Sequence, residues 1–214
     1  MELRRLFLVA LAIATLLGSS LARADIVTYT DRNAFQAATS NTGTDTFADI
    51  VPLQPYGNLN RTAGAYNYSV SGSAGVLYGA GTASDPWLST NWTDATMIFS
   101  NFSGGVNALG GFFFGTDLFG NFTPHTMVTL TANDGSMIVY NLTDTTTSSF
   151  IGFVSSSPLV SVMLSNVTGQ QFWPAANDLV LGMAAPVPEP ATYAMLLCAL
   201  PLLGLATRRR VARR

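Results

Sequence analysis

Short apolar runs separated by Gly, Asn, Ser and Asp fill the middle of the chain. They are rich in β-branched and aromatic residues, and several alternate apolar with polar positions. This pattern is typical of antiparallel strands that bury one face. We therefore predict strands at residues 26–29, 44–50, 65–70, 75–79, 96–100, 108–115, 126–132, 136–142, 150–154, 159–165 and 178–182.

The clearest pair of strands lies in TMVTLTANDGSMIVYNL, residues 126–142. Apolar positions alternate with threonines before the turn, and Ile138 and Tyr140 share a face after it. The pair Asp134-Gly135 favours the positive φ angles of a tight hairpin turn. The segment predicts a hairpin with one buried and one solvated face.

Only one segment has helical spacing. DRNAFQAAT, residues 31–39, places Phe35 on an apolar face, with Thr30 or Asp31 as its N-cap. The run Phe112-Phe113-Phe114 instead predicts a central strand that is buried on both faces. We therefore predict an all-β fold, a single antiparallel β-sandwich with one short N-terminal helix.

The first 24 residues have a different character. They contain a basic start, an uncharged apolar run and the small residues Ala22 and Ala24, which is the order found in a secretory signal peptide. The alternative is an N-terminal membrane anchor, but the run is short for a span. We expect export through the Sec translocon and cleavage by signal peptidase, which leaves residues 25–185 as an extracytoplasmic domain.

Residues 186–214 combine a proline-rich hinge, an apolar run and a basic end. Residues 191–207 carry no charge, and as a helix they would extend about 25 Å, close to the thickness of a thin hydrocarbon core. Arginines resist translocation, so the basic end at residues 208–214 is predicted to stay cytoplasmic while the domain stays outside. These arginines are Arg208, Arg209, Arg210, Arg213 and Arg214.

The motif Val187-Pro188-Glu189-Pro190, followed by this apolar run and these arginines, resembles the PEP-CTERM sorting signal of Gram-negative bacteria. The resemblance implies processing by an exosortase, a transient anchor in the inner membrane and a final place at the cell surface or in the extracellular matrix. It also implies a structural or adhesive role associated with exopolysaccharide and biofilm. An ordinary tail anchor with a proline-rich stalk is the alternative.

Within the domain, YTDRNAFQAAT (residues 29–39), ALGGFFFGTDLFGN (residues 108–121) and FWPAANDLVLG (residues 172–182) resemble an ectodomain often attached to this tail. Such ectodomains are similar to the jelly-roll sandwiches of carbohydrate-binding modules. The resemblance therefore implies a jelly-roll-like fold. Related proteins often carry Asp-Asn in the last strand, whereas this chain carries Asn177-Asp178.

The charge of residues 25–185 excludes one class of partner. They contain ten Asp, two Arg and no Lys or Glu, a formal charge of −8 with histidine neutral. Without a basic surface for phosphates, the domain is not expected to bind nucleic acid. The only cysteine, Cys198, lies in the tail, so the domain holds no disulfide.

Aromatic and acidic residues supply the candidate ligand sites. Trp87, Trp92 and Trp173 could stack on sugars, which makes a carbohydrate-binding module, calcium-dependent or not, the alternative function. Oxygen ligands suit calcium, and the candidates for a structural calcium site are Asp49, Asp117 and Asp178. Aspartates that cap turns are the simpler explanation for these residues, and no other cofactor is expected.

The sequence favours a protein that is not an enzyme. His125 is the only histidine, and no Gly-x-Ser-x-Gly segment accompanies it. No spacing among the aspartates singles out a carboxylate pair of the glycosidase kind. A secreted hydrolase is kept as a third hypothesis.

Overall fold

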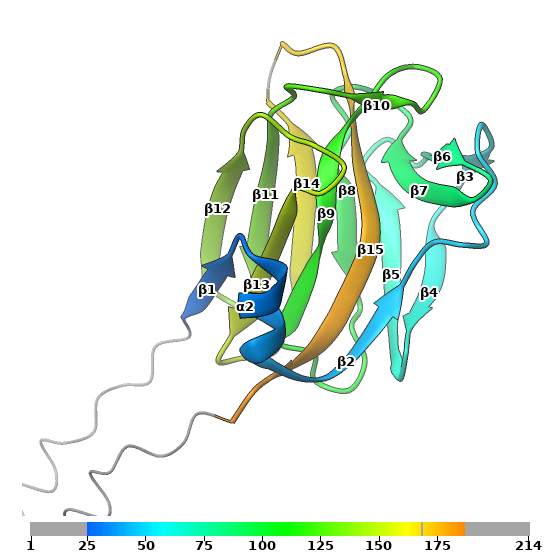
Figure 1. Cartoon of the computed structure of the whole chain (residues 1–214). Coiled ribbons are helices and arrows are strands. Elements are labelled where there is room, and N and C mark those ends of the chain that lie inside the picture. The colour runs from blue at the N-terminus through cyan, green and yellow to red at the C-terminus, as the bar shows by residue number, and fades with distance from the viewer. Residues whose placement is uncertain (1–24, 168, 187–214) are drawn as a thin grey trace, which may run out of the picture. The chain divides into compact units, whose positions relative to one another are not determined.

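The computed structural model describes residues 25–167 and 169–186. They form two antiparallel β-sheets with one short helix, so the prediction of an all-β fold is confirmed (Figure 1). No helix within these ranges is long and apolar enough to cross a membrane. The predicted cleavage residues Ala22 and Ala24, the sorting motif at residues 187–190, the predicted span and the arginines at residues 208–214 all lie outside the described residues.

The larger sheet contains nine strands. They are β1 (Ile26–Tyr29), β2 (Thr39–Asp45), β3 (Pro55–Tyr56), β6 (Leu77–Thr82), β7 (Asp85–Thr90), β9 (Ala108–Thr116), β10 (Phe122–Thr123), β13 (Phe150–Ser155) and β15 (Trp173–Ala184). Their order is β1-β13-β9-β15-β7-β6-β3, with β10 paired to β9 and β2 paired to β15.

The smaller sheet contains six strands. They are β4 (Leu59–Ala63), β5 (Tyr66–Gly72), β8 (Met97–Ser100), β11 (Val128–Asn133), β12 (Met137–Leu142) and β14 (Ser161–Asn166). Their order is β12-β11-β14-β8-β5-β4.

The two sheets share one hydrophobic core. The larger sheet contributes Leu109 and Phe113 to it, and the smaller sheet contributes Phe99 and Leu164, all fully buried. Burial of each such side chain stabilises the fold by about 1.5–3 kcal/mol. The apolar positions of β11 face this core while its threonines are half-buried, as the alternation in the sequence predicts.

The strand β9 lies in the middle of the larger sheet and is buried on both faces, which confirms the prediction for the phenylalanine run. Phe113 faces the core between the sheets, whereas Phe112 and Phe114 point to the outer face of the larger sheet. Two separate clusters cover that outer face. One contains Phe35 of the helix, and the other contains Trp87 of β7.

The helix α2 (Arg32–Ala37) covers one end of this outer face (Figure 1). Asp31 is its N-cap, and the Asp31 carboxylate accepts a hydrogen bond of 2.8 Å from the Ala34 amide. Phe35 is fully buried, with its ring centroid 5.4 Å from that of Phe150. A Cβ added to Gly152 would lie 2.3 Å from this ring, so the sheet must carry glycine beneath the helix.

The strand β15 changes partner along its length. One edge pairs with β9 at residues 173–177 and 180–182, while the other edge pairs with β7 at Ala175 and Ala176 and with β2 from Leu179 onward. The register with β9 shifts between Asn177 and Val180. Asp178 has a φ of +46°, a left-handed conformation that suits a bulge. The sheet therefore divides at this point into two branches.

Some predicted elements are wrong in detail. Only the first two residues of the predicted strand 44–50 are in a strand, because β2 ends at Asp45 and the Asp45 carboxylate caps a turn by accepting from the Phe47 amide at 2.9 Å. The predicted hairpin around Gly135 is present, but its pairing leaves a three-residue loop in which Gly135 has a φ of +107°. The strands β3, β4, β7 and β10 have no counterpart among the predicted strands.

Candidate functional site

Residues 117–121, which we call the strap loop, join β9 to β10. The Asp117 amide donates to the Asn121 carbonyl at 2.8 Å, and the Asp117 carboxylate accepts from the amides of Phe119 and Asn121 at 2.8 Å each. Burial alone would raise the pKa of Asp117, but the hydrogen bonds from Asn121 and Phe119 outweigh it and hold this pKa below its ordinary value. The strap loop is therefore stiffened by an ionised aspartate.

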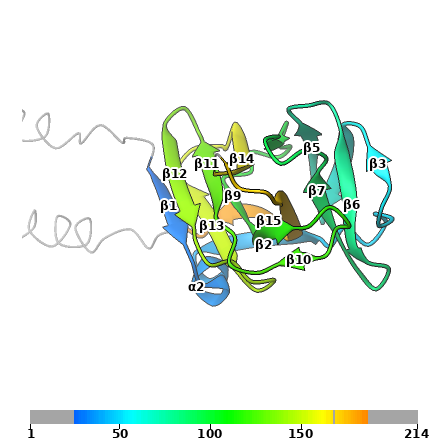
Figure 2. The same cartoon turned by 90° about the horizontal axis from the view of Figure 1, so that it is seen from above.

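The strap loop also reaches across the outer face of the larger sheet. The Gly81 amide of β6 donates to the Gly120 carbonyl at 2.9 Å, although β15 and β7 lie between β9 and β6 in the sheet (Figure 2). Gly120 has a φ of +75°, and an added Cβ would lie 2.9 Å from Ala80 Cα. Only glycine fits this approach without strain.

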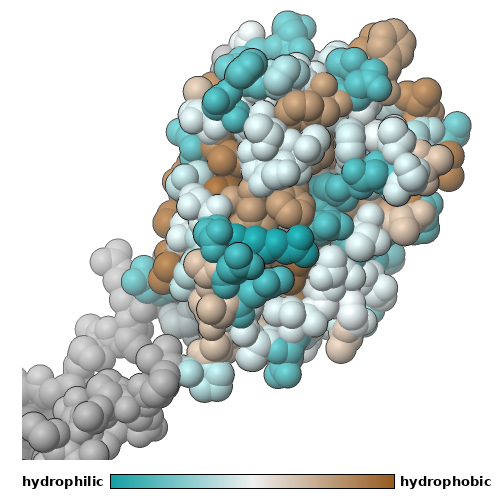
Figure 3. Space-filling model, viewed as in Figure 1, coloured by the Kyte–Doolittle hydropathy of each residue, from teal (hydrophilic) through white to brown (hydrophobic). Residues whose placement is uncertain are grey.

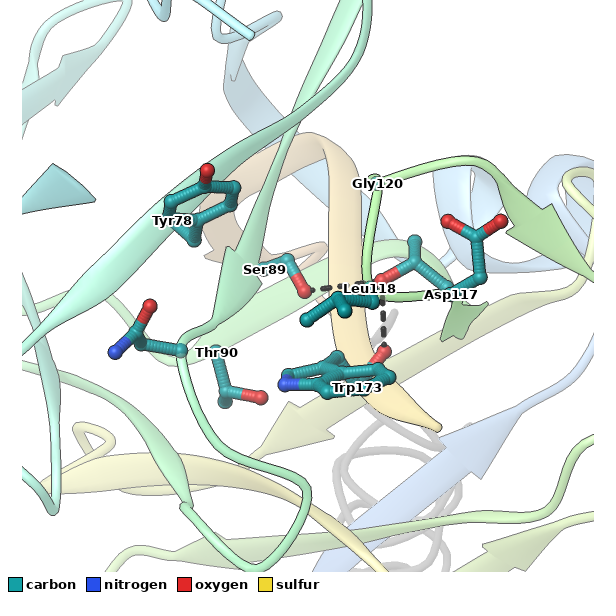
Figure 4. A pocket seen from close by; sticks show the side chains of 9 residues that line it. Tyr78, Ser89, Thr90, Asp117, Leu118, Gly120 and Trp173 are labelled. Atoms are coloured by element: carbon teal, nitrogen blue, oxygen red, sulfur yellow. Dashed lines mark hydrogen bonds between the residues drawn. The ribbon is translucent and has the colours of Figure 1, made fainter. Parts of the chain in front are cut away.

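A pocket of about 130 Å³ opens between the strap loop and the sheet (Figure 4). We call it the Trp173 pocket. The strands β6 and β7 contribute Tyr78, Ser89 and Thr90, and Asn91 follows directly. The strand β9 and the strap loop contribute Thr116, Asp117, Leu118 and Gly120, and Trp173 comes from the start of β15.

Two buried hydroxyls form the polar part of this pocket. The hydroxyl oxygens of Ser89 and Thr116 lie 3.2 Å apart, and each hydroxyl has one proton to donate. The Ser89 hydroxyl donates to the Pro174 carbonyl at 3.2 Å, and the Thr116 hydroxyl donates to the Trp173 carbonyl at 3.2 Å. These bonds fix the ends of β7, β9 and β15 against one another, so the pocket has a rigid base (Figure 4).

Apolar and aromatic side chains surround that base. Tyr78 and Trp173 are half-buried and stand apart across the pocket, whereas the Asp117 carboxylate points away from both (Figure 4). Leu118 is 64% exposed, and its neighbour Phe119 is 67% exposed without lining the pocket. In the space-filling view, apolar side chains protrude at the end of the molecule where the strap loop lies (Figure 3). The pocket thus offers flat aromatic surface beside a few polar groups, a composition suited to sugar rings.

Of the three candidate tryptophans, Trp173 alone lines this pocket. Trp87 is buried against Phe114 in an edge-to-face contact of 5.1 Å, and its indole N–H has no hydrogen-bond partner among the described residues. Trp92 is 57% exposed, and its carbonyl accepts from the Thr90 hydroxyl at 2.9 Å. The structure therefore separates the three tryptophans into a buried one, an exposed one and one in a pocket.

A second depression, of about 360 Å³, contains an ion-pair cluster. Arg61 binds Asp45 through Nε at 2.6 Å and Asp49 through Nη2 at 2.6 Å, and its guanidinium lies 5.0 Å from the centroid of the Phe47 ring. The Tyr68 hydroxyl donates to the Asp45 carboxylate at 2.7 Å. Both the Arg61 and the Asp45 side chains are buried, so this is a structural cluster around a buried charge pair.

The cluster shifts several pKa values. The hydrogen bond from Arg61 holds the pKa of Asp49 below its ordinary value. Burial would lower the pKa of Arg61, but hydrogen bonds to Asp45 and Asp49 outweigh it and raise this pKa. Burial raises the pKa of Tyr68 as well, and the neighbouring Asp45 adds to that effect. Arg61 therefore remains charged and Tyr68 remains neutral over the whole physiological range.

The three calcium candidates do not gather in one place. The Asp49 carboxylate binds Arg61, and the Asp117 carboxylate binds its own strap loop. Asp178 lies in the bulge of β15, where its amide donates to the Asn177 side chain at 2.9 Å. Within the ranges 25–167 and 169–186, no group of three or more His, Cys, Asp or Glu side chains is placed to hold a metal ion. The calcium hypothesis thus rests on ligand chemistry alone.

The histidine lies in an exposed loop. His125 lies on a loop with a φ of +59°, and its exposed ring contacts the exposed Asp144 carboxylate. Neither residue lines the Trp173 pocket.

Sequence reasoning did not bring Ser89, Thr116 and Leu118 together. They come from segments that meet only when β7, β9 and β15 pair, and Ser89 belongs to a strand that was not predicted. One local signal was available for the strap loop, because Asp117, Gly120 and Asn121 are turn-forming residues directly after an apolar strand.

Comparison with models of known protein families gives no match for this chain. No curated protein matches its sequence at a significant level either.

Proposed function

We propose that this chain is an exported protein of a Gram-negative bacterium that an exosortase sorts to the cell surface or the extracellular matrix. Its role there is structural or adhesive, in association with exopolysaccharide, and not enzymatic. The observation that carries the proposal is the order of the Pro188-Glu189-Pro190 motif, an uncharged run and five arginines. The apolar start of the chain supports the same orientation.

The boundary of the folded domain is consistent with processing at the hinge. By its internal contacts the chain divides between Ala184 and Ala185, and Ala184 is the last residue of β15. The Pro-Glu-Pro motif begins after this boundary, so cleavage there would remove no strand residue. A processed domain would retain both sheets and their common core.

The topology supports a relation to jelly-roll sandwiches. The chain passes from β8 in the smaller sheet to β9 in the larger one, and from β12 it alternates between the sheets up to β15. Such crossings between two facing sheets are typical of jelly rolls. We infer that the domain is jelly-roll-like, as carbohydrate-binding modules are.

A second candidate function is a carbohydrate-binding module, and the Trp173 pocket favours it. The pocket combines two aromatic side chains with hydroxyl and amide groups on a rigid base. Sugar binding and a matrix role are compatible, because an adhesive protein needs a surface that recognises the polymer.

The sorting proposal predicts that replacing Pro188-Glu189-Pro190 with three alanines blocks processing. In the native host, a membrane-anchored precursor should accumulate and the mature form should disappear from the surface fraction. Gel mobility and mass spectrometry of the C-terminus would measure both forms. Pro201→Ala, which changes a proline of the predicted span and leaves the motif intact, is the matched control. Normal processing of the triple variant would overturn the sorting proposal.

A further inference from the structure

The Trp173 pocket is already shaped before any ligand arrives. Its base is fixed by the Ser89 and Thr116 hydrogen bonds, and its outer wall is fixed by the internal bonds of Asp117 and by the contact of Gly120 with β6. A rigid site loses little conformational freedom when a ligand binds. This feature distinguishes the pocket from a gap between mobile surface loops.

The charge of the pocket selects against anions. Asp117 is the one charged residue among those that line it, and its lowered pKa keeps it ionised. Each arginine of the described residues is engaged elsewhere, since Arg61 binds Asp45 and Arg32 lies over the Phe112 ring at 5.3 Å. A uronate or a sulfated sugar would therefore meet a negative field without a basic partner.

The chemistry of the walls fits a neutral sugar. The half-buried Trp173 and the exposed Leu118 provide apolar surface for the C–H face of a pyranose ring. The half-buried Asn91 adds an amide at the same pocket, which can donate to and accept from sugar hydroxyls, whereas the buried Thr90 hydroxyl is already bonded to the Trp92 carbonyl. One apolar face and several neutral hydroxyls are what distinguish hexoses from peptides and from phosphates.

The size of the pocket limits how much of a glycan it can hold. Its volume of about 130 Å³ is well below the roughly 300–1,000 Å³ of sites that enclose drug-sized ligands. It can accommodate one sugar unit, while the remainder of a polymer stays outside. Such a site favours the end of a chain over its middle.

We propose that the Trp173 pocket binds the terminal unit of a neutral glycan, with Trp173 and Leu118 as its apolar walls. This proposal rests on the carbohydrate-binding function proposed above and specifies its site and ligand class.

The test uses the full chain, purified in detergent micelles. A glycan array with neutral, amino, uronic and sulfated oligosaccharides would identify the class that binds. Titration calorimetry with the best neutral oligosaccharide, and with the same oligosaccharide blocked at its terminal unit, would then give Kd values. We expect binding to neutral glycans only, and a loss of at least about ten-fold in affinity on blocking the terminal unit, equivalent to about 1.4 kcal/mol.

Matched variants locate the site. Trp173→Ala should weaken binding by at least about ten-fold, whereas Trp92→Ala, at an exposed tryptophan outside the pocket, should leave Kd unchanged. Leu118→Ser should weaken binding more than Phe119→Ser, although both side chains are exposed on the strap loop. Because Leu118 is exposed, this second pair remains informative even where Trp173→Ala disturbs folding.

The outcomes separate the two proposals. Binding of a neutral glycan that is unaffected by Trp173→Ala and Leu118→Ser would overturn the pocket assignment and leave the carbohydrate-binding function in place. Selective binding of uronic or sulfated sugars would overturn the proposed ligand class, neutral glycans, and would also leave the carbohydrate-binding function in place. An array without any bound glycan would overturn both the pocket assignment and the carbohydrate-binding function, while the sorting proposal would stand on its own experiment.

Discussion

Arg61 is the residue on which the ion-pair cluster depends. It lies between Asp45, which is 6% exposed, and the surface residue Asp49, and it covers the Phe47 ring. A buried carboxylate that loses its partner retains the cost of leaving water without the compensating attraction. Arg61, a residue type that usually lies at the surface, is therefore essential for the stability of a buried part of the β-sandwich.

We predict that Arg61→Met destabilises the fold by about 3–5 kcal/mol, because Asp45 would be left buried without its ionic partner. Urea unfolding followed by tryptophan fluorescence would measure the change. Arg32→Met, which removes only a cation–π contact with Phe112, is the control and should cost less than about 1 kcal/mol. Equal effects of the two substitutions would show that the buried pair has no special weight.

This cluster could not be predicted from the sequence. Arg61 and Asp45 are 16 residues apart and lie on strands of different sheets. Nothing in the local pattern around either residue indicates a buried charge. Only the packing of Tyr68 and Phe47 beside them creates the low-dielectric environment that makes the pair matter.

At the scale of elements, the helix α2 shows how a short segment is held by tertiary contacts. Six residues are too few for a stable isolated helix, so its stability comes from Phe35 and from the Asp31 cap. The Phe35 ring sits over Gly110 and Gly152, whose missing side chains leave room for it. The helix therefore packs on the sheet through three complementary positions, the ring of Phe35 and the two glycines beneath it.

We predict that Phe35→Ala lowers stability by about 3–5 kcal/mol and detaches the helix from the larger sheet. Hydrogen exchange should show faster exchange at the Phe35 and Ala38 amides, which bond to Asp31 and Ala34. Gln36→Ala, at the neighbouring exposed position, should change stability by less than about 0.5 kcal/mol. A comparable loss in both variants would contradict this role of Phe35.

Strands in which apolar and polar residues alternate clearly were predicted well, and strands without this alternation were not. The strands β11 and β12 follow from the pattern because β11 buries one face and β12 half-buries one. The strand β7 escaped prediction because its sequence DPWLST begins with an aspartate and a proline, and its place is set by pairing with β6 and β15. The segment 44–50 looked like a strand, but the turn capped by Asp45 interrupts it.

The Trp173 pocket was only partly predictable for a related reason. Trp173 was a candidate from its residue type, whereas Ser89, Thr116 and Leu118 gain a role only through the order of strands in the larger sheet. Strand order is set by contacts between residues far apart in sequence, which a local pattern does not report.

At the scale of the whole molecule, stability should have a broad maximum against pH. Asp49, Asp117 and Asp134 have pKa values below the ordinary 3.8, because their carboxylates accept hydrogen bonds in the folded state. Their contribution is complete above 3.8 and is lost as the pH falls through the lowered values. Tyr68 has a raised pKa, so its contribution is present below the ordinary 10.0 and is lost as the pH rises above it.

We therefore predict a plateau in the thermal midpoint between about pH 4 and pH 10, with a fall on either side. Circular dichroism melts of the full chain across this range would measure it. Tyr68→Phe tests the cause of the fall above pH 10, because a phenylalanine side chain has no proton to lose at that pH. If the alkaline fall were unchanged in this variant, Tyr68 would not be its cause.

The course of β15 has a mechanical consequence. The strand starts at Trp173 beside the pocket and ends at Ala184, where the chain leaves the sandwich, a path of roughly 40 Å at about 3.4 Å per residue. If the pocket binds a polymer and the C-terminal tail tethers the chain, as proposed above, a pull between the two would run along this one strand. The hydrogen bonds of β15 with β9, β7 and β2 would then be loaded in shear, many at once. The polymer should therefore dissociate from the pocket before the domain unfolds.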